Sequence, residues 1–273
     1  MEKLDRLGWA AGISVLAYGV RVGVRVNVPE ALSFLPNLLP PSWKPSRSSK
    51  VGRLYSFIMA EPEKPRGRRV HLLFGDLLPL ARSRDLTVAL DALESDMHRY
   101  VAEWAPRRLF VHAGVVGWKG RAILIPGRSF SGKSTLVAEL IRAGATYYSD
   151  EYAVLDGDGM VHPFSRPLGL RTTGDGKTGR HRVEAFGSRA GVKPLPVGLV
   201  LVSRYRAGAR FTPRRATAGQ GALDLLANAV SVRRQPGATL AALRRAVSEA
   251  TVLRGARGEA AEVATRLLLE QRV

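Results

Sequence analysis

The sequence contains no cysteine, and this absence removes several kinds of chemistry from consideration. A chain without thiols forms no disulfide, binds no metal through thiolates and has no cysteine nucleophile. It also lacks any uninterrupted apolar stretch of the roughly 18–20 residues that a membrane-spanning helix requires. These absences favour a chain that folds in a reducing compartment, and we expect a cytoplasmic protein without a membrane span.

Aromatic residues are scarce, at 7% of the chain, and acidic residues (23) are far fewer than basic ones (42). The basic excess is concentrated in residues 164–215, where twelve basic residues accompany only Asp175 and Glu184. Such a patch can hold a polyanion, an acidic peptide or a triphosphate. Aromatic residues do not alternate with the charges as they do where bases stack, so the pattern argues against nucleic acid as a partner.

Residues 127–135 contain the most specific pattern in the chain. Gly127, Gly132, Lys133 and Ser134 satisfy the G-x-x-x-x-G-K-[ST] spacing of a phosphate-binding loop. The glycines let the backbone wrap a phosphate chain with its N–H groups pointing inward, and the following helix directs its positive end at the same anion. An apolar run precedes the loop and a helix-periodic segment follows it, as the motif requires. The sequence therefore predicts binding of a nucleoside triphosphate.

The chemistry of this motif assigns roles to individual side chains. Lys133 would reach the β- and γ-phosphates, and the Ser134 hydroxyl would ligate Mg²⁺. We therefore expect ATP and Mg²⁺ as cofactors, although the motif does not distinguish ATP from GTP. The residues expected to line the nucleotide site are Gly127, Arg128, Ser129, Phe130, Ser131, Gly132, Lys133, Ser134 and Thr135.

Residues 1–105 predict a small α+β domain that carries no catalytic constellation. Strict alternation over Tyr18–Val28 predicts one half-buried strand, and the apolar runs 54–59 and 70–74 predict two more. Apolar residues at three- and four-residue spacing over Asp85–Trp104 predict an amphipathic helix, with its first residue as the cap.

Residues 106–273 predict a second domain built around the phosphate loop. The strands predicted at Leu109–Val116 and Arg121–Pro126 are joined by a turn too short for a crossover, so they must pair antiparallel. The strand that leads into the loop is therefore expected to have an antiparallel neighbour, unlike the loop strand of the usual doubly wound P-loop fold, whose neighbours are parallel. Further segments are predicted as strands at 146–155 and 196–203, as helices at 220–229, 238–249 and 259–271, and as a mobile loop at 172–182.

Four elements follow one another in this domain: His112-Ala113-Gly114, the loop at 127–134, a helix, and Ser149-Asp150-Glu151. This order resembles the catalytic domain of the bacterial HPr serine kinase/phosphorylase family, which has the phosphoenolpyruvate-carboxykinase-like P-loop fold. The resemblance covers about residues 108–165. His112 matches the family's histidine, and Asp150 and Glu151 occupy the positions of its acidic pair.

The resemblance implies an α/β (α+β) fold, with a mixed-sheet P-loop kinase domain of this type preceded by a small α+β N-terminal domain. It implies an ATP-dependent kinase that transfers the γ-phosphoryl group to a hydroxyl of a peptide, protein or small-molecule acceptor, and it implies a homo-oligomer. Asp150 would be the general base, Glu151 would hold Mg²⁺ together with Ser134, and His112 would bind the transferred phosphate or orient Asp150. Lys133 completes the catalytic set. The candidate phosphate clamps are Arg166, Arg171, Arg204 and Arg206.

The sequence also departs from the family's pattern. Phe130 stands where glycine is usual, and Glu151 stands where a second aspartate is usual. The segment Arg166–Arg171 echoes the family's later basic-glycine signature without its acidic residue, so the second metal ligand is unassigned. This absence leaves an alternative open, a nucleotide-binding regulatory protein that transfers nothing.

Overall fold

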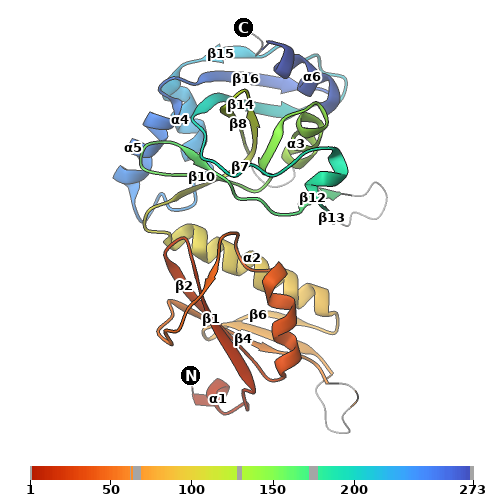
Figure 1. The fold of residues 1–273 in the computed structure, drawn as a ribbon, viewed down its shortest axis with the longest axis vertical. Helices are drawn as coiled ribbons and strands as arrows, with labels where there is room; N and C mark the ends of the chain where they lie inside the picture. Colours follow the sequence, from red (N-terminus) through yellow and green to blue (C-terminus); the bar gives the residue numbers. More distant parts are fainter. Residues whose placement is uncertain (1, 62, 64–68, 128–130, 172–177, 271–273) are drawn as a thin grey trace. The chain divides into compact units, whose positions relative to one another are not determined.

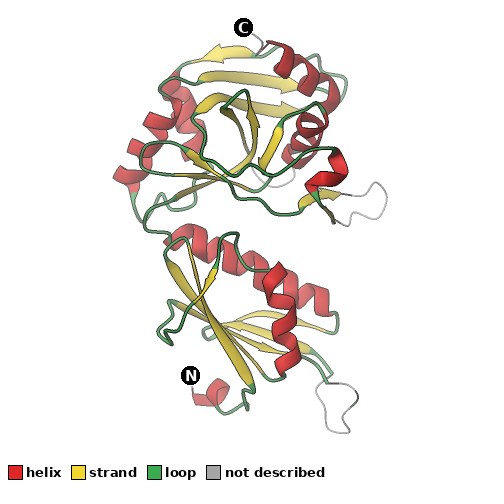
Figure 2. Ribbon diagram, in the orientation of Figure 1, coloured by secondary structure: helices red, strands yellow, loops and turns green. Residues whose placement is uncertain are grey.

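The structure is a computed structural model that describes residues 2–61, 63, 69–127, 131–171 and 178–270. The chain divides into two compact units, Met1–Arg107 and Arg108–Val273, and each has its own sheet. Both units combine helices with mixed sheets, so the fold class is α/β (Figures 1 and 2). In the part of the chain that the structure describes, no helix is both long and apolar enough to cross a bilayer.

The first unit is a six-stranded sheet in the order β3-β1-β2-β4-β5-β6, against which the long helix α2 packs. The buried face of α2 includes Leu93 and Met97, and its capping residue Asp85 accepts a hydrogen bond from the Thr87 N–H at 2.8 Å. This cap and this helix are as the sequence predicts. The elements are α1 (Glu2–Asp5), β1 (Ala11–Ala17), β2 (Val20–Val26), the 3₁₀ helix η1 (Pro29–Asn37), β3 (Lys44–Pro45), β4 (Arg53–Ile58), β5 (His71–Gly75), β6 (Leu78–Ser83) and α2 (Leu86–Trp104).

The single strand predicted over Tyr18–Val28 is wrong at its start. The chain turns at Tyr18 and Gly19, whose φ angles are +50° and +82°, and β1 pairs antiparallel with β2 across this turn. Two-residue hairpin turns with positive φ at both positions match the twist of the flanking strands, and glycine adopts such angles freely. Tyr18 falls in phase with the valines that follow it, which is why the alternation runs through the turn.

The second unit is an eight-stranded sheet in the order β11-β10-β7-β8-β14-β16-β15, with β9 also paired to β7. β8 pairs antiparallel with β7 and parallel with β14, which confirms the predicted mixed sheet. The elements are β7 (Leu109–Trp118), β8 (Arg121–Pro126), α3 (Lys133–Arg142), β9 (Thr146–Ser149), β10 (Tyr152–Leu155), β11 (Val161–His162), β12 (Leu168–Arg171), β13 (Thr178–His181), η2 (Val183–Phe186), β14 (Val197–Tyr205), β15 (Arg214–Ala216), α4 (Ala218–Leu226), α5 (Pro236–Val247), β16 (Thr251–Arg257) and α6 (Ala260–Glu270).

Helices cover both faces of this second sheet. Successive residues of β8 point to opposite faces. Ile123 and Ile125 pack with residues of α3 and α6, whereas Ala122 and Leu124 pack with residues of α4 and α5. β8 is therefore buried on both sides, and the phosphate loop leaves its carboxyl end from within the core of the unit.

Two further predictions need correction. The strand predicted over 146–155 is two strands, β9 and β10, interrupted at Asp150 and Glu151, and both pair with β7. The loop predicted over 172–182 includes a strand, because β13 pairs antiparallel with β12. Residues 172–177 lie outside the described residues. Glycine and charged residues in β13 give it no apolar alternation, so its pairing cannot be seen in the sequence.

Candidate functional site

The described part of the phosphate loop is held between β7 and α3. The Gly127 N–H donates to the carbonyl of His112 on β7 at 3.1 Å, and Gly132 precedes the first turn of α3. Gly132 has φ +79°, in the left-handed region that favours glycine. Its carbonyl accepts the helix bond from Leu136 N at 3.1 Å. Of the expected nucleotide-binding residues, Arg128, Ser129 and Phe130 lie outside the described residues.

Lys133 begins α3 and is partly buried beside the two carboxylates of the predicted acidic pair. Burial lowers the pKa of Lys133, while the negative charges of Asp150 and Glu151 act in the opposite direction. The two carboxylates thus oppose the effect of burial on the lysine that the motif directs at a phosphate chain. Thr135, also expected at the nucleotide, lies exposed on the first turn of the helix.

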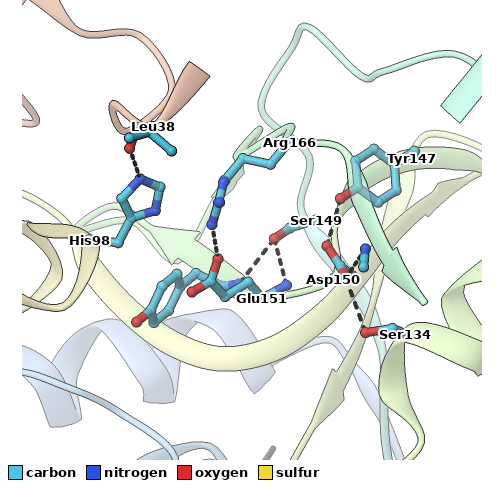
Figure 3. A network of polar contacts seen from close by, with 10 residues as sticks. Leu38, His98, Ser134, Tyr147, Ser149, Asp150, Glu151 and Arg166 are labelled. Carbon is cyan, nitrogen blue, oxygen red and sulfur yellow. Dashed lines mark hydrogen bonds and ion pairs between the residues drawn. The ribbon is translucent and has the colours of Figure 1, made fainter. Parts of the chain in front are cut away.

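Asp150 lies at the centre of a hydrogen-bond network next to the loop (Figure 3). Its Oδ2 accepts from the Ser134 Oγ at 3.0 Å and from the Gly169 N–H at 3.1 Å. Its Oδ1 accepts from the Tyr147 hydroxyl at 2.8 Å. Burial raises the pKa of Tyr147 well above its usual value, and the charge of Asp150 adds to this effect, so the phenol stays a donor. The carboxylate is thus aimed at the loop hydroxyl by two neighbours.

The bend between β9 and β10 places Asp150 and Glu151 side by side. The Ser149 Oγ accepts hydrogen bonds from the N–H groups of Glu151 at 3.1 Å and Tyr152 at 3.0 Å. This short-range capping by serine explains why the strand is interrupted here. The Glu151 carboxylate forms an ion pair with Arg166, one of the predicted clamps (Figure 3).

His112 is fixed to the loop through its backbone and to β10 through its ring. Its backbone carbonyl accepts the Gly127 N–H, and its backbone N–H donates to the Asn228 carbonyl at 2.8 Å. The centroid of its imidazole ring lies 4.7 Å from that of the Tyr152 ring. Burial lowers the pKa of His112, and the charge of Lys133 lowers it further. His112 thus contacts the loop through its backbone carbonyl, which accepts the Gly127 N–H, and Asp150 contacts it through the Ser134 hydroxyl.

The other predicted clamps lie on β12 and at the end of β14. Arg171 ends β12, and Arg204 and Arg206 are exposed at the end of β14. A cation that contacts the described part of the loop is Arg257, at the end of β16, whose Nη2 donates to the Gly132 carbonyl at 2.9 Å. No sequence pattern marks this residue, because its position depends on the parallel pairing of β14 with β16.

The oxygen donors near the loop suit Mg²⁺. Ser134 Oγ and Asp150 Oδ2 lie 3.0 Å apart. Mg²⁺ is usually held by one or two protein oxygens together with substrate phosphates and water, rather than by a full protein cage. No group of three His, Asp or Glu residues that could hold a metal is found among the described residues.

Comparison with known proteins adds a likeness to solved structures. No family model matches the sequence, and no curated protein matches it. Among solved structures, the chain is similar to the HPr(Ser) kinase/phosphatase from Coxiella burnetii, with 16% identity and a TM-score of 0.35. The match covers 60% of this chain and 95% of that chain. It falls in the family that the order of motifs in residues 108–165 resembles. At this TM-score it contributes nothing to the site's chemistry, which has to be inferred from the site's own contacts.

Proposed function

We propose that this chain is an ATP-dependent kinase that transfers the γ-phosphoryl group of ATP to a hydroxyl of a peptide, protein or small-molecule acceptor. The observation that carries the proposal is the hydrogen bond between Ser134 of the loop and Asp150 at the strand end, 3.0 Å long. It joins the two groups that phosphoryl transfer needs together, a hydroxyl that ligates Mg²⁺ and a carboxylate beside the transferred phosphate.

The residues divide the reaction between them. The loop N–H groups and Lys133 bind and orient the triphosphate, so that its γ-phosphorus faces the acidic pair. The acceptor oxygen attacks that phosphorus, Asp150 takes the hydroxyl proton, and the bond from the γ-phosphorus to the β,γ-bridging oxygen breaks to release ADP. Positioning and charge neutralisation supply most of the rate in such transfers. Bound Mg²⁺, held by Ser134 and Glu151, would neutralise the phosphate charge.

Glu151, Arg166 and His112 complete the proposed site. The Glu151–Arg166 ion pair puts a guanidinium next to the acidic pair, where it can turn to the γ-phosphate once a nucleotide is bound. In that state Glu151 would be available to Mg²⁺, directly or through water. His112, held neutral by burial and by Lys133, would donate or accept a hydrogen bond at the transferred phosphate or orient Asp150.

One observation favours the alternative, a regulatory protein that binds a nucleotide without transferring phosphate. Both carboxylates of the acidic pair already have partners: Asp150 has three hydrogen-bond donors, and Glu151 has Arg166. A site that keeps these contacts with ATP bound would sense the nucleotide and not use it. The two functions share the loop and differ in what Asp150 does.

Calorimetry and a transfer assay together test the proposal. The wild-type chain is expected to bind Mg²⁺-ATP and to move the γ-phosphate of radiolabelled ATP to a peptide or protein encoded next to it. Lys133→Ala removes the lysine aimed at the β- and γ-phosphates, so its Kd for ATP should rise at least about tenfold, which corresponds to about 1.4 kcal/mol.

Lys119→Ala is the matched control, because Lys119 lies in the hairpin turn between β7 and β8. It should leave ATP binding unchanged. A folded Lys133→Ala protein with wild-type affinity would refute nucleotide binding at the loop. Tight ATP binding without transfer to any neighbouring acceptor would instead favour the regulatory protein.

A further inference from the structure

A buried arginine that belongs to no predicted motif contacts the phosphate loop. Arg257 ends β16, and only 3% of its surface is exposed. Its Nη2 donates to the carbonyl oxygens of Ser131 at 3.3 Å and Gly132 at 2.9 Å, residues that lie 126 and 125 positions earlier in the chain. Strand β16 is thus tied directly to the loop.

The burial of this guanidinium is only partly compensated, by its hydrogen bonds to carbonyls and by the Tyr205 ring, whose centroid lies 5.6 Å from the Arg257 Cζ. Burial lowers the pKa of Arg257, against the opposing influence of Glu259 and Tyr205. Its Nη1 reaches the Gly258 carbonyl at 3.4 Å, and its Nε has no hydrogen-bond partner among the described residues. Burying a cation with few partners destabilises a folded protein. Its position against the loop therefore points to a role other than stability.

The orientation of two peptide groups supplies that role. In a planar trans peptide, the C=O and the following N–H point in opposite directions. Because the carbonyls of Ser131 and Gly132 face Arg257, the N–H groups of Gly132 and Lys133 face away from it. Those N–H groups are the donors that a loop of this motif presents to a phosphate.

The same contact explains why position 132 is glycine. Besides its positive φ, Gly132 lacks the Cβ atom that would lie 2.5 Å from the Arg257 Nη2. The guanidinium occupies the space that any other side chain would need. Glycine and arginine together therefore define the shape of the loop at this point.

We infer that Arg257 is a positioning residue of the phosphate loop. It holds the carbonyl groups of Ser131 and Gly132, so that the N–H groups of Gly132 and Lys133 face the triphosphate. This inference rests on nucleotide binding at the loop, as proposed above. Arg257 acts through the loop from its far side, and it also places a positive charge behind the anion.

Arg257→Gln tests the inference with two readouts. Glutamine keeps a polar side chain but loses the charge and the guanidinium fork. We expect the Kd and the KM for Mg²⁺-ATP to rise at least about tenfold, while the KM for the acceptor stays within about twofold. Hydrogen exchange of the amides in residues 131–135 should become faster in the nucleotide-free variant, since the loop loses its support. Arg254→Gln is the matched control, because Arg254 lies on the same strand and pairs with Asp224 at 3.1 Å. It should leave both readouts unchanged.

Arg257→Lys keeps the positive charge but loses the planar guanidinium with its several N–H donors. The Kd of this variant for ATP should still rise at least threefold. This variant replaces Arg257→Gln if the latter does not fold. Both readouts are measured well below the unfolding temperature of the variant. A folded variant whose ATP affinity and amide exchange rates in residues 131–135 stay within twofold of wild type would overturn the positioning role. If the wild-type chain itself binds no ATP, the proposed function fails, whereas the exchange measurement still decides whether Arg257 shapes the loop.

Discussion

The Ser134 Oγ donates a hydrogen bond to the Asp150 Oδ2 at 3.0 Å and so joins the first turn of α3 to the bend between β9 and β10. Asp150 follows Ser134 by 16 residues in the chain. Asp150 is itself oriented by Tyr147 and by the backbone of Gly169. The hydroxyl proposed to ligate Mg²⁺ is therefore oriented by contacts within the protein.

Ser134→Ala should raise the Mg²⁺ concentration needed for half-maximal activity at least tenfold, because it removes a metal ligand and leaves the phosphate-binding backbone intact. Ser134→Thr keeps the hydroxyl and should stay within about threefold of wild type. Titrating the transfer rate with Mg²⁺ at saturating ATP measures both. Equal Mg²⁺ requirements in the alanine and threonine variants would rule out Ser134 as a ligand.

Asp150→Asn should lower the rate of phosphoryl transfer by about 10²–10⁴-fold, the usual contribution of general-base assistance. ATP binding should survive, since Lys133 and the loop backbone are untouched. Single-turnover transfer and calorimetry separate the two effects. Asp156→Asn is the control, because the Asp156 carboxylate follows β10 and is hydrogen-bonded to His162. This variant should transfer phosphate at the wild-type rate. Asp150→Asn at half the wild-type rate or above would exclude Asp150 as the base.

Gly114→Ala should destabilise the second unit by about 1–3 kcal/mol, the usual effect of overpacking. A Cβ at this position would lie 2.6 Å from the Val137 Cγ2, so β7 and α3 pack closely only over a glycine. Thermal unfolding measures the loss. Adding Val137→Ala makes room for the new methyl group, and the double variant should be more stable than the sum of the two single effects. Strict additivity would show that the two positions do not contact each other in solution.

Acid should destabilise the first unit through His71. This side chain is buried, its Nδ1 accepts the Ala60 N–H at 3.1 Å, and burial lowers the pKa of His71 below its usual 6.5. The unfolded chain therefore takes up the proton first as the pH falls. The stability that the neutral ring supplies is complete above pH 6.5 and is lost as the pH drops from there toward the folded pKa.

An NMR titration of the His71 imidazole should give a midpoint below 6.5. His71→Gln should weaken the fall in thermal stability between pH 7.5 and pH 5.5 that the wild type shows. A midpoint at or above the usual histidine value would contradict the effect of burial.

The loop and the β7–β8 pair could be predicted because their signals are local. The motif spacing identifies the loop, and the turn at Lys119 and Gly120, whose φ angles are +46° and +76°, allows only a hairpin. His112 and Asp150 are candidates through the order of motifs in residues 108–165, which resembles the HPr serine kinase/phosphorylase family.

The partners of those residues could not be predicted, because they come together only in the folded sheet. Arg257 reaches the loop through the parallel pairing of β14 with β16, and no local pattern reveals which distant strands will be neighbours. Tyr147 reads as a core residue of β9, yet its hydroxyl is bonded to Asp150. Among the four candidate arginines, Arg166 forms an ion pair with Glu151, which the sequence does not indicate.

The parallel ladder β8-β14-β16 also governs when the site can form. The residues of the motif precede β14 and β16 in the chain, but β8, which leads into them, gains its second neighbour only when β14 pairs, and Arg257 reaches the loop only when β16 pairs with β14. Pairings between strands far apart in sequence form slowly. A chain that stops before β16 would contain every residue of the nucleotide motif and still lack the arginine behind its loop. Nucleotide affinity should therefore be acquired in the final stage of folding, which makes it a measure of whether the second unit has been completed.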